Sequence, residues 1–203
     1  STFPRYRNFI KPNTWKETGE NGGGLTYNLG AHVIDQAVQL FGMPEAVFAD
    51  IATLRTGGKV DDYFIIHLMK PARMPEVKIT LKASYLMCEN EPRFVLHGTE
   101  GSYVKYGLDP QEADLTKGML PDTPHWGEED ESQWGILHTE TDGNVVRKPY
   151  PTLPGNYAAF YENIYQHIRN GAVLQSDACG VLGVIRLIEA AWESSRTGNV
   201  IKL

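Results

Sequence analysis

VKITLKASYL, residues 77–86, alternates apolar and polar side chains over its whole length. Successive side chains of a β-strand point to opposite faces, so this pattern predicts a strand with one face on a hydrophobic core. That face would carry Val77, Ile79, Leu81, Ala83 and Tyr85. Because such alternation is typical of antiparallel sheets, the stretch also predicts how its neighbours pair with it.

The two preceding segments have the composition of partner strands. AVFADIATL (46–54) and DDYFIIHLM (61–69) are short and rich in β-branched and aromatic residues. Turn clusters separate them, TGGK before the second and KPARMP after it. We therefore expect three neighbouring antiparallel strands.

Two hairpins are predicted downstream. RFVLHGTEGSYVKYG (93–107) contains the first, and the second joins GILHTET (135–141) to NVVRKPY (144–150). We expect these strands to continue one sheet over residues 45–150. An acidic excursion containing Pro and Gly, residues 108–133, would interrupt it.

Helical periodicity predicts helices on both sides of the sheet region, at residues 22–42, 156–170 and 177–197, while residues 1–21 read as a loop. A helix, a run of strands and then helices is the order of an α+β domain. The predicted fold class is α+β, with an open, mostly antiparallel β-sheet and helices covering one face. The other face would serve dimerisation, and residues 1–203 would form one domain.

Composition excludes several classes of partner. The chain has 203 residues and a formal charge of −6, and its Lys and Arg are scattered, which argues against nucleic acid. No apolar run approaches the roughly 20 residues that a membrane span needs. Cys88 and Cys179 show no CxxC spacing, so we expect reduced thiols in the core and a cytoplasmic protein. A targeting segment upstream of the abrupt start STFPRYRNF remains open.

ENGGGLTYNLGAHVIDQ, residues 20–36, places three glycines before the first predicted helix. A dinucleotide-binding G-x-G-x-x-G motif would need a third glycine where Tyr27 stands and a strand before it, so a phosphate site is disfavoured. Two alternatives remain from the residues alone. The glycines can serve a plain helix entry with His32 as a structural histidine. They can instead line a gap above Asn28 and His32, four residues apart, that accepts a small polyhydroxylated substrate.

The same stretch carries a family resemblance. GGGLTYNLGAHVIDQAVQLFGMPEAVFADI resembles the start of the C-terminal domain of the glucose-fructose oxidoreductase and inositol dehydrogenase family of NAD(P)-dependent oxidoreductases. FVLHGTEGSYVKYGLDPQE, WGEEDESQWG, GNYAAFYENIYQHIRNG and VIRLIEAAWESSRTGNVIKL follow in the order expected for that family. The resemblance therefore covers nearly the whole chain.

The resemblance implies half of an enzyme. Family members carry an N-terminal Rossmann domain, so NAD or NADP would be bound by that missing domain, and no cofactor is expected for this chain alone. Hydride would pass between the nicotinamide and a sugar, cyclitol or related carbinol. His32 falls on the catalytic histidine that accepts the hydroxyl proton, and the open sheet face would form a homo-oligomer.

Asn28 departs from the family pattern, in which many relatives have aspartate. An amide can orient a histidine ring but adds no charge, so Asn28 either leaves His32 a weaker base or mainly binds a substrate hydroxyl. Other residues with a predicted substrate-binding role are Gly23, Gly24, Trp15, Lys16, Asn156 and Tyr157. Trp15 could instead be a packing anchor and Asn156 an ordinary helix cap.

The remaining histidines give little further signal. His125 and Trp126 lie in the acidic excursion, which could be a lid over the pocket or a surface loop. No HxxxH or HExxH pairing occurs, so no metal site is predicted. Two hypotheses follow for the chain: a substrate-binding and dimerisation domain, inactive in isolation, of a full-length oxidoreductase, or a non-catalytic assembly module derived from that family.

Overall fold

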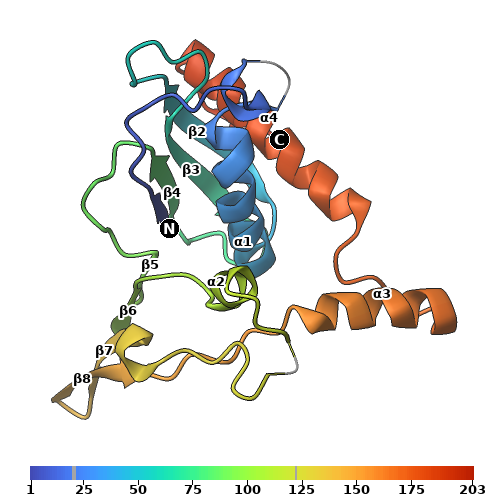
Figure 1. The fold of residues 1–203 in the computed structure, drawn as a ribbon. Helices are drawn as coiled ribbons and strands as arrows, with labels where there is room; N and C mark the ends of the chain where they lie inside the picture. Colours follow the sequence, from blue (N-terminus) through green and yellow to red (C-terminus); the bar gives the residue numbers. More distant parts are fainter. Residues whose placement is uncertain (20–21, 122) are drawn as a thin grey trace. The chain divides into compact units, whose positions relative to one another are not determined.

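The computed structural model describes residues 1–19, 22–121 and 123–203. The chain forms two compact units, unit 1 (residues 1–91 and 178–203) and unit 2 (residues 92–177) (Figure 1). The predicted α+β class with mostly antiparallel strands is confirmed. The single sheet expected over residues 45–150 is wrong, because the strands divide into a five-stranded and a four-stranded sheet.

The sheet of unit 1 has the strand order β1-β4-β3-β2-β9. Its strands are β1 (Thr2–Pro4), β2 (Pro44–Ala52), β3 (Tyr63–Pro71), β4 (Ile79–Ser84) and β9 (Ile201–Lys202). β1 runs parallel to β4, and the other pairs are antiparallel. The core face predicted for residues 77–86 is confirmed at Ile79, Leu81, Ala83 and Tyr85, which are all buried.

Strand β1 forms one edge of the unit 1 sheet. It pairs with β4 in the register Thr2–Lys82 to Pro4–Ser84. The expected loop 1–21 is therefore wrong at this strand, and also at the 3₁₀ helix η1 (Trp15–Glu17). Residues 20 and 21 of that loop lie outside the described part of the chain.

Two helices cover one face of the unit 1 sheet. α1 (Ala31–Phe41) and α4 (Ala178–Thr197) pack on the buried face of this sheet, around Val47, Phe64 and Leu187. α4 also supplies a hydrogen-bond partner to the outer edge of β2, since Ser194 Oγ accepts the N–H of Ala49 at 3.0 Å. That bond caps an edge that would otherwise expose an unpaired donor.

Unit 2 contains the second sheet, in the order β5-β6-β7-β8 and antiparallel throughout. Its elements are β5 (Phe94–His97), β6 (Gly101–Lys105), α2 (Gln111–Thr116), η3 (Glu131–Gln133), β7 (Gly135–Thr141), β8 (Asn144–Tyr150) and α3 (Ala158–Asn170). Both predicted hairpins are confirmed. The excursion 108–133 holds one short helix and one 3₁₀ turn among its described residues.

The structure also tests the expectations for the two cysteines and for membrane-spanning segments. Cys88 and Cys179 are free, but both are exposed, so their predicted place in the core is wrong. Cys88 follows the end of β4 and Cys179 lies in the first turn of α4, where neither side chain reaches the packed face. Among the described residues, no helix is long and apolar enough to cross a membrane.

Candidate functional site

Gly24 and Asp61 set the start of the first helical region. Gly24 has a φ of +90°, and a Cβ there would lie 1.8 Å from Oδ1 of Asp61. Thr26 donates to Oδ2 of Asp61 from its backbone N–H at 2.6 Å and from its hydroxyl at 2.7 Å. Burial raises the pKa of Asp61 above its ordinary value, although the two bonds from Thr26 oppose that shift. The glycine therefore permits close approach of a carboxylate from another segment.

The expected single helix over 22–42 is wrong at its beginning. The chain forms a π-helical segment η2 (Thr26–Gly30) before the α-helix α1. Asn28 lies on the π-helical segment, and His32 is the second residue of α1. Short π-helical turns occur frequently at functional sites because they redirect side chains locally.

The imidazole of His32 is exposed and makes no side-chain hydrogen bond to another described residue. Asn28 differs, because both ends of its amide are engaged. Lys16 Nζ donates to Asn28 Oδ1 at 2.8 Å, and Asn28 Nδ2 makes a long bond of 3.5 Å to the hydroxyl of Tyr85. The structure thus joins Lys16 and Asn28, two residues named from the sequence, and adds a buried tyrosine.

A buried ion network supports this arrangement. Glu17 is 6% exposed and binds Arg7 and Arg55, each at 2.9 Å. Arg55 also binds Asp62 at 2.9 Å. The two guanidinium groups lie over the Tyr85 ring, at 4.0 Å for Arg7 and 4.7 Å for Arg55.

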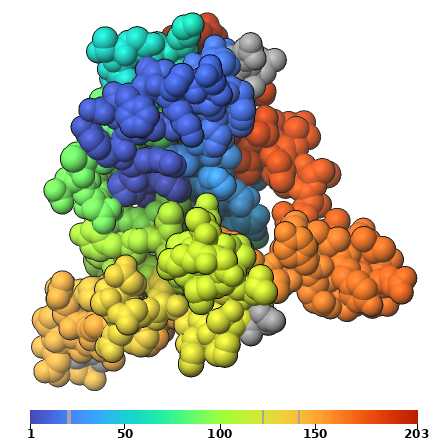
Figure 2. Space-filling view, viewed as in Figure 1, coloured from blue at the N-terminus to red at the C-terminus, as the bar shows by residue number. Residues whose placement is uncertain are grey.

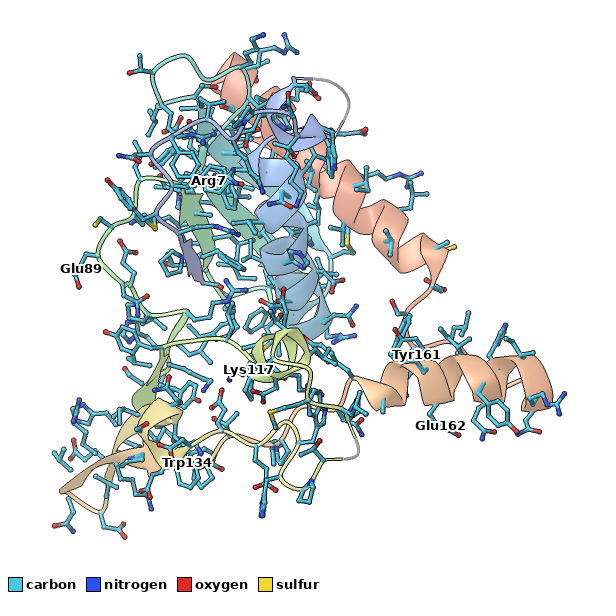
Figure 3. The ribbon with its side chains drawn as sticks, in the orientation of Figure 1. Arg7, Glu89, Lys117, Trp134, Tyr161 and Glu162 are labelled. Carbon is cyan, nitrogen blue, oxygen red and sulfur yellow. The ribbon has the colours of Figure 1, made fainter. Side chains whose placement is uncertain are left out.

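The network fastens the N-terminal segment to unit 1. Arg55 donates to the carbonyl of Phe9 at 2.8 Å, and in Figure 2 the blue N-terminal segment lies beside the cyan loop that contains Arg55. Figure 3 shows Arg7 where this segment crosses the strands of unit 1. Breaking one partner of a buried pair commonly costs about 3–5 kcal/mol, so the segment that carries Lys16 is firmly placed.

The glycines and Trp15 lie close to the same group. The N–H of Gly24 donates to the carbonyl of Lys16 at 3.0 Å, and Gly23 is half-buried. Trp15 is 58% exposed, with its ring centroid 5.7 Å from Nζ of Lys16. An exposed indole beside a lysine is more consistent with a contact surface than with a core anchor.

Asn156 and Tyr157 belong to unit 2. Asn156 Oδ1 accepts the N–H of Ala159 at 3.1 Å, so it caps α3, which supports the structural alternative for this residue. The N–H of Tyr157 donates to Oε1 of the buried Gln111 at 2.8 Å. Burial raises the pKa of the Tyr157 phenol, with smaller contributions from nearby acidic residues. Their substrate-binding role stays a prediction.

Of the two residues named from the acidic excursion, His125 and Trp126, the tryptophan is tied into unit 2. The indole N–H of Trp126 donates to Oε1 of Gln111 at 2.8 Å, so this ring is tied into unit 2. His125 is exposed and pairs with Glu128 at 2.9 Å.

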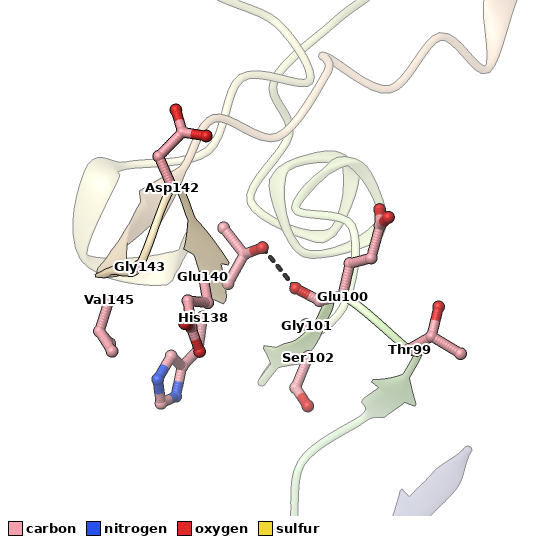
Figure 4. A pocket seen from close by; sticks show the side chains of 10 residues that line it. Thr99, Glu100, Gly101, Ser102, His138, Glu140, Asp142, Gly143 and Val145 are labelled. Atoms are coloured by element: carbon pink, nitrogen blue, oxygen red, sulfur yellow. Dashed lines mark hydrogen bonds between the residues drawn. The ribbon is translucent and has the colours of Figure 1, made fainter.

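A hollow of about 770 Å³ lies at the tips of the second sheet (Figure 4). Its lining includes Glu100, His138, Glu140 and Asp142, and Thr139 donates to the carbonyl of Glu100. None of the residues predicted from the sequence lines it. Among the described residues no cluster of three potential metal ligands occurs. The candidate site is therefore the group around Asn28 and His32.

Sequence reasoning missed two tyrosines in unit 1. The alternation in 77–86 predicts Tyr85 on the core face of its strand, and a buried tyrosine hydroxyl normally needs a hydrogen-bond partner, which is the signal that points to it. Tyr27 follows Thr26 in η2, and burial raises the pKa of its phenol, with further contributions from Glu189 and Asp61. The raised pKa keeps this phenol neutral at about pH 7.

Comparisons with known proteins agree with this architecture. The family model described as "Oxidoreductase family, C-terminal alpha/beta domain" matches residues 2–203. The chain is 35% identical to the Bacillus subtilis scyllo-inositol 2-dehydrogenase (NADP(+)) IolW, over 100% of this chain and 55% of that protein. A crystal structure from Bacteroides fragilis, described only as an oxidoreductase, superposes with a TM-score of 0.90 at 60% identity, over 100% of this chain and 56% of that one.

A second structure, the oxidoreductase YvaA of Bacillus subtilis, has a TM-score of 0.90 at 34% identity, again over 100% of this chain and 56% of that one. The chain thus spans a little over half the length of the relatives that it matches. It belongs to the glucose-fructose oxidoreductase and inositol dehydrogenase family, as its C-terminal α/β domain.

Proposed function

We propose that this chain is the substrate-binding and dimerisation domain of an NAD(P)-dependent oxidoreductase that acts on a sugar, cyclitol or related polyol. Family membership and the similarity to a scyllo-inositol dehydrogenase support the reaction class. The nicotinamide would accept or deliver the hydride. It would be bound outside this chain, because the close approach at Gly24 is occupied by the Asp61 carboxylate, which disfavours a cofactor phosphate.

His32 would accept the proton of the substrate hydroxyl. The observation that supports this role most directly is its exposed imidazole, one helical turn beyond an asparagine that Lys16 and Tyr85 hold in place. Histidine titrates nearest to neutral pH of all side chains, so it can take and return a proton under physiological conditions. Asn28, Lys16, Trp15 and the adjacent glycines would position the polyol.

Dimerisation would use the uncovered face of the unit 1 sheet. Along β3, Phe64, Ile66 and Leu68 are buried beneath the helices, whereas the alternate residues Tyr63, Ile65, His67 and Met69 are only half-buried. A sheet face this rich in large side chains is typical of one that receives a partner.

The test uses the full-length protein with NADP and NAD, and scyllo-inositol, myo-inositol and glucose as substrates. His32→Ala should lower kcat by about 100- to 10,000-fold, the usual contribution of a general base. His97→Ala is the matched control, because His97 is an exposed histidine on β5 that bonds to Ser102 in unit 2. If the kcat of His32→Ala equalled that of the wild type across the pH range, His32 would not be the general base.

The same assay separates the enzyme from the assembly module. A wild-type protein that turns over no member of the panel with either cofactor, yet remains oligomeric, would favour the non-catalytic alternative. Turnover that depends on His32 would eliminate it.

A further inference from the structure

We propose that Lys16 and Asn28 together make the site selective for a polyol carrying an anionic group, a carboxylate or a phosphate, near the reacting hydroxyl. This inference rests on the proposed function and deepens it by naming a substrate class. It comes from the juxtaposition of a fixed ammonium group with an amide in place of a carboxylate.

Lys16 is held before any substrate arrives. Its carbonyl accepts the N–H of Gly24 at 3.0 Å, and its own N–H donates to Thr14 Oγ1 at 3.4 Å. The next residue, Glu17, is buried between Arg7 and Arg55. A side chain whose backbone is fixed on both sides loses less conformational freedom on binding, so its contribution to affinity is larger.

No carboxylate among the described residues neutralises Lys16. Its partner Asn28 Oδ1, at 2.8 Å, is a neutral acceptor. Three acidic residues of unit 1 have other partners: Glu17 binds the two arginines, Asp62 binds Arg55, and Asp61 binds Thr26. Among the described residues the ammonium group thus bonds to a neutral oxygen, which takes one of its three N–H donors.

A substrate that covers Lys16 removes water from this charge. A neutral polyol would offer only hydroxyl oxygens in exchange, which leaves the desolvation of the ammonium poorly compensated. A carboxylate or phosphate oxygen would form charge-assisted hydrogen bonds, which are about twice as strong as neutral ones. An aspartate at position 28, as the family resemblance gives for many relatives, would neutralise the lysine internally. Asn28 is thus the residue that leaves the charge available.

The experiment measures kcat/KM of the full-length enzyme for glucuronate, glucose 6-phosphate and glucose. The wild type should prefer at least one anionic substrate by about tenfold or more, the usual gain from a charge-assisted bond. Asn28→Asp should reduce that preference at least tenfold by pairing with Lys16, and Lys16→Met should abolish it. Lys78→Met, at an exposed lysine just before β4, should leave the preference unchanged. The two anionic substrates show whether carboxylate or phosphate is the group recognised.

The outcomes separate this inference from the proposed function. Efficient turnover of glucose or scyllo-inositol, with no anionic preference and no change in Asn28→Asp, would overturn the inference and leave the proposed function intact. If no substrate is turned over, calorimetric titration of glucuronate and glucose into wild type and Lys16→Met decides the matter. Tighter glucuronate binding that is lost in Lys16→Met supports the anion site, and equal binding of both ligands refutes it.

Discussion

Replacing Gly24 with alanine would test the start of the π-helical turn, because two separate restrictions meet at this glycine. Its φ of +90° lies in a region that an L side chain enters at a cost of about 1–2 kcal/mol. A Cβ would also lie 1.8 Å from Oδ1 of Asp61, so the buried carboxylate would have to move away from Thr26. Hydrogen bonds to a charged group contribute about 1.5–3 kcal/mol. If one of the two bonds is lost, the two effects predict a loss of about 2.5–5 kcal/mol in the free energy of unfolding of unit 1.

Gly57 provides a matched control. Its φ is +76°, and no atom lies within 4 Å of an added Cβ, so Gly57→Ala should cost only the backbone strain of about 1–2 kcal/mol. Native-state hydrogen exchange of core amides such as Ile66, in the full-length protein, measures the free energy of opening of unit 1. In a variant that already carries Asp61→Ala, adding Gly24→Ala should destabilise unit 1 only as much as Gly57→Ala destabilises the wild type. Equal costs for the two glycines, or no change on removing the carboxylate, would refute the reasoning.

Two other properties of unit 1 can be tested in the same protein. The raised pKa of Asp61 means that the native state binds this proton more tightly than the unfolded chain, so the stabilisation is fully present below the ordinary aspartate pKa of about 3.9 and is lost as pH rises through the raised value. Asp61→Asn should therefore gain stability relative to wild type as the pH rises above about 4 in urea unfolding, and a pH-independent difference would contradict this. Ile65→Lys, on the uncovered sheet face, should convert a dimer to a monomer in sedimentation velocity, whereas Val145→Lys, at an exposed site on β8, should not. A dimer that survives Ile65→Lys would place the interface elsewhere.

Elements with a strong local pattern could be predicted from the sequence. The predicted helices 156–170 and 177–197 differ by two residues or fewer from α3 and α4, and the alternation in 77–86 identified the core face of β4. The pairing of β1 could not be predicted, because Thr2–Pro4 is too short to show a period and its partner lies about 80 residues away. That one contact occupies the edge of β4.

The candidate site was predictable as a set of residues but not as a geometry. Lys16 and Asn28 were singled out separately, and only the fold shows that the ammonium binds the amide oxygen. Tyr85, 57 residues from Asn28, enters through tertiary contact alone. The ion network is equally non-local, since Arg55 and Glu17 are separated by 38 residues and no sequence pattern links them.

The π-helical turn shows why local spacing was insufficient at the site itself. Leu25, Leu29 and Val33 recur every four residues, a spacing that favours a continuous α-helix, and all three are buried. The conformation is decided instead by Asp61, 35 residues away, which takes the N–H and hydroxyl of Thr26 that begin the turn. Because backbone donors must be satisfied wherever they are buried, a remote carboxylate can replace the local helical start. The placement of Asn28 therefore depends on a carboxylate 35 residues from Thr26, and no motif centred on the glycines could have included it.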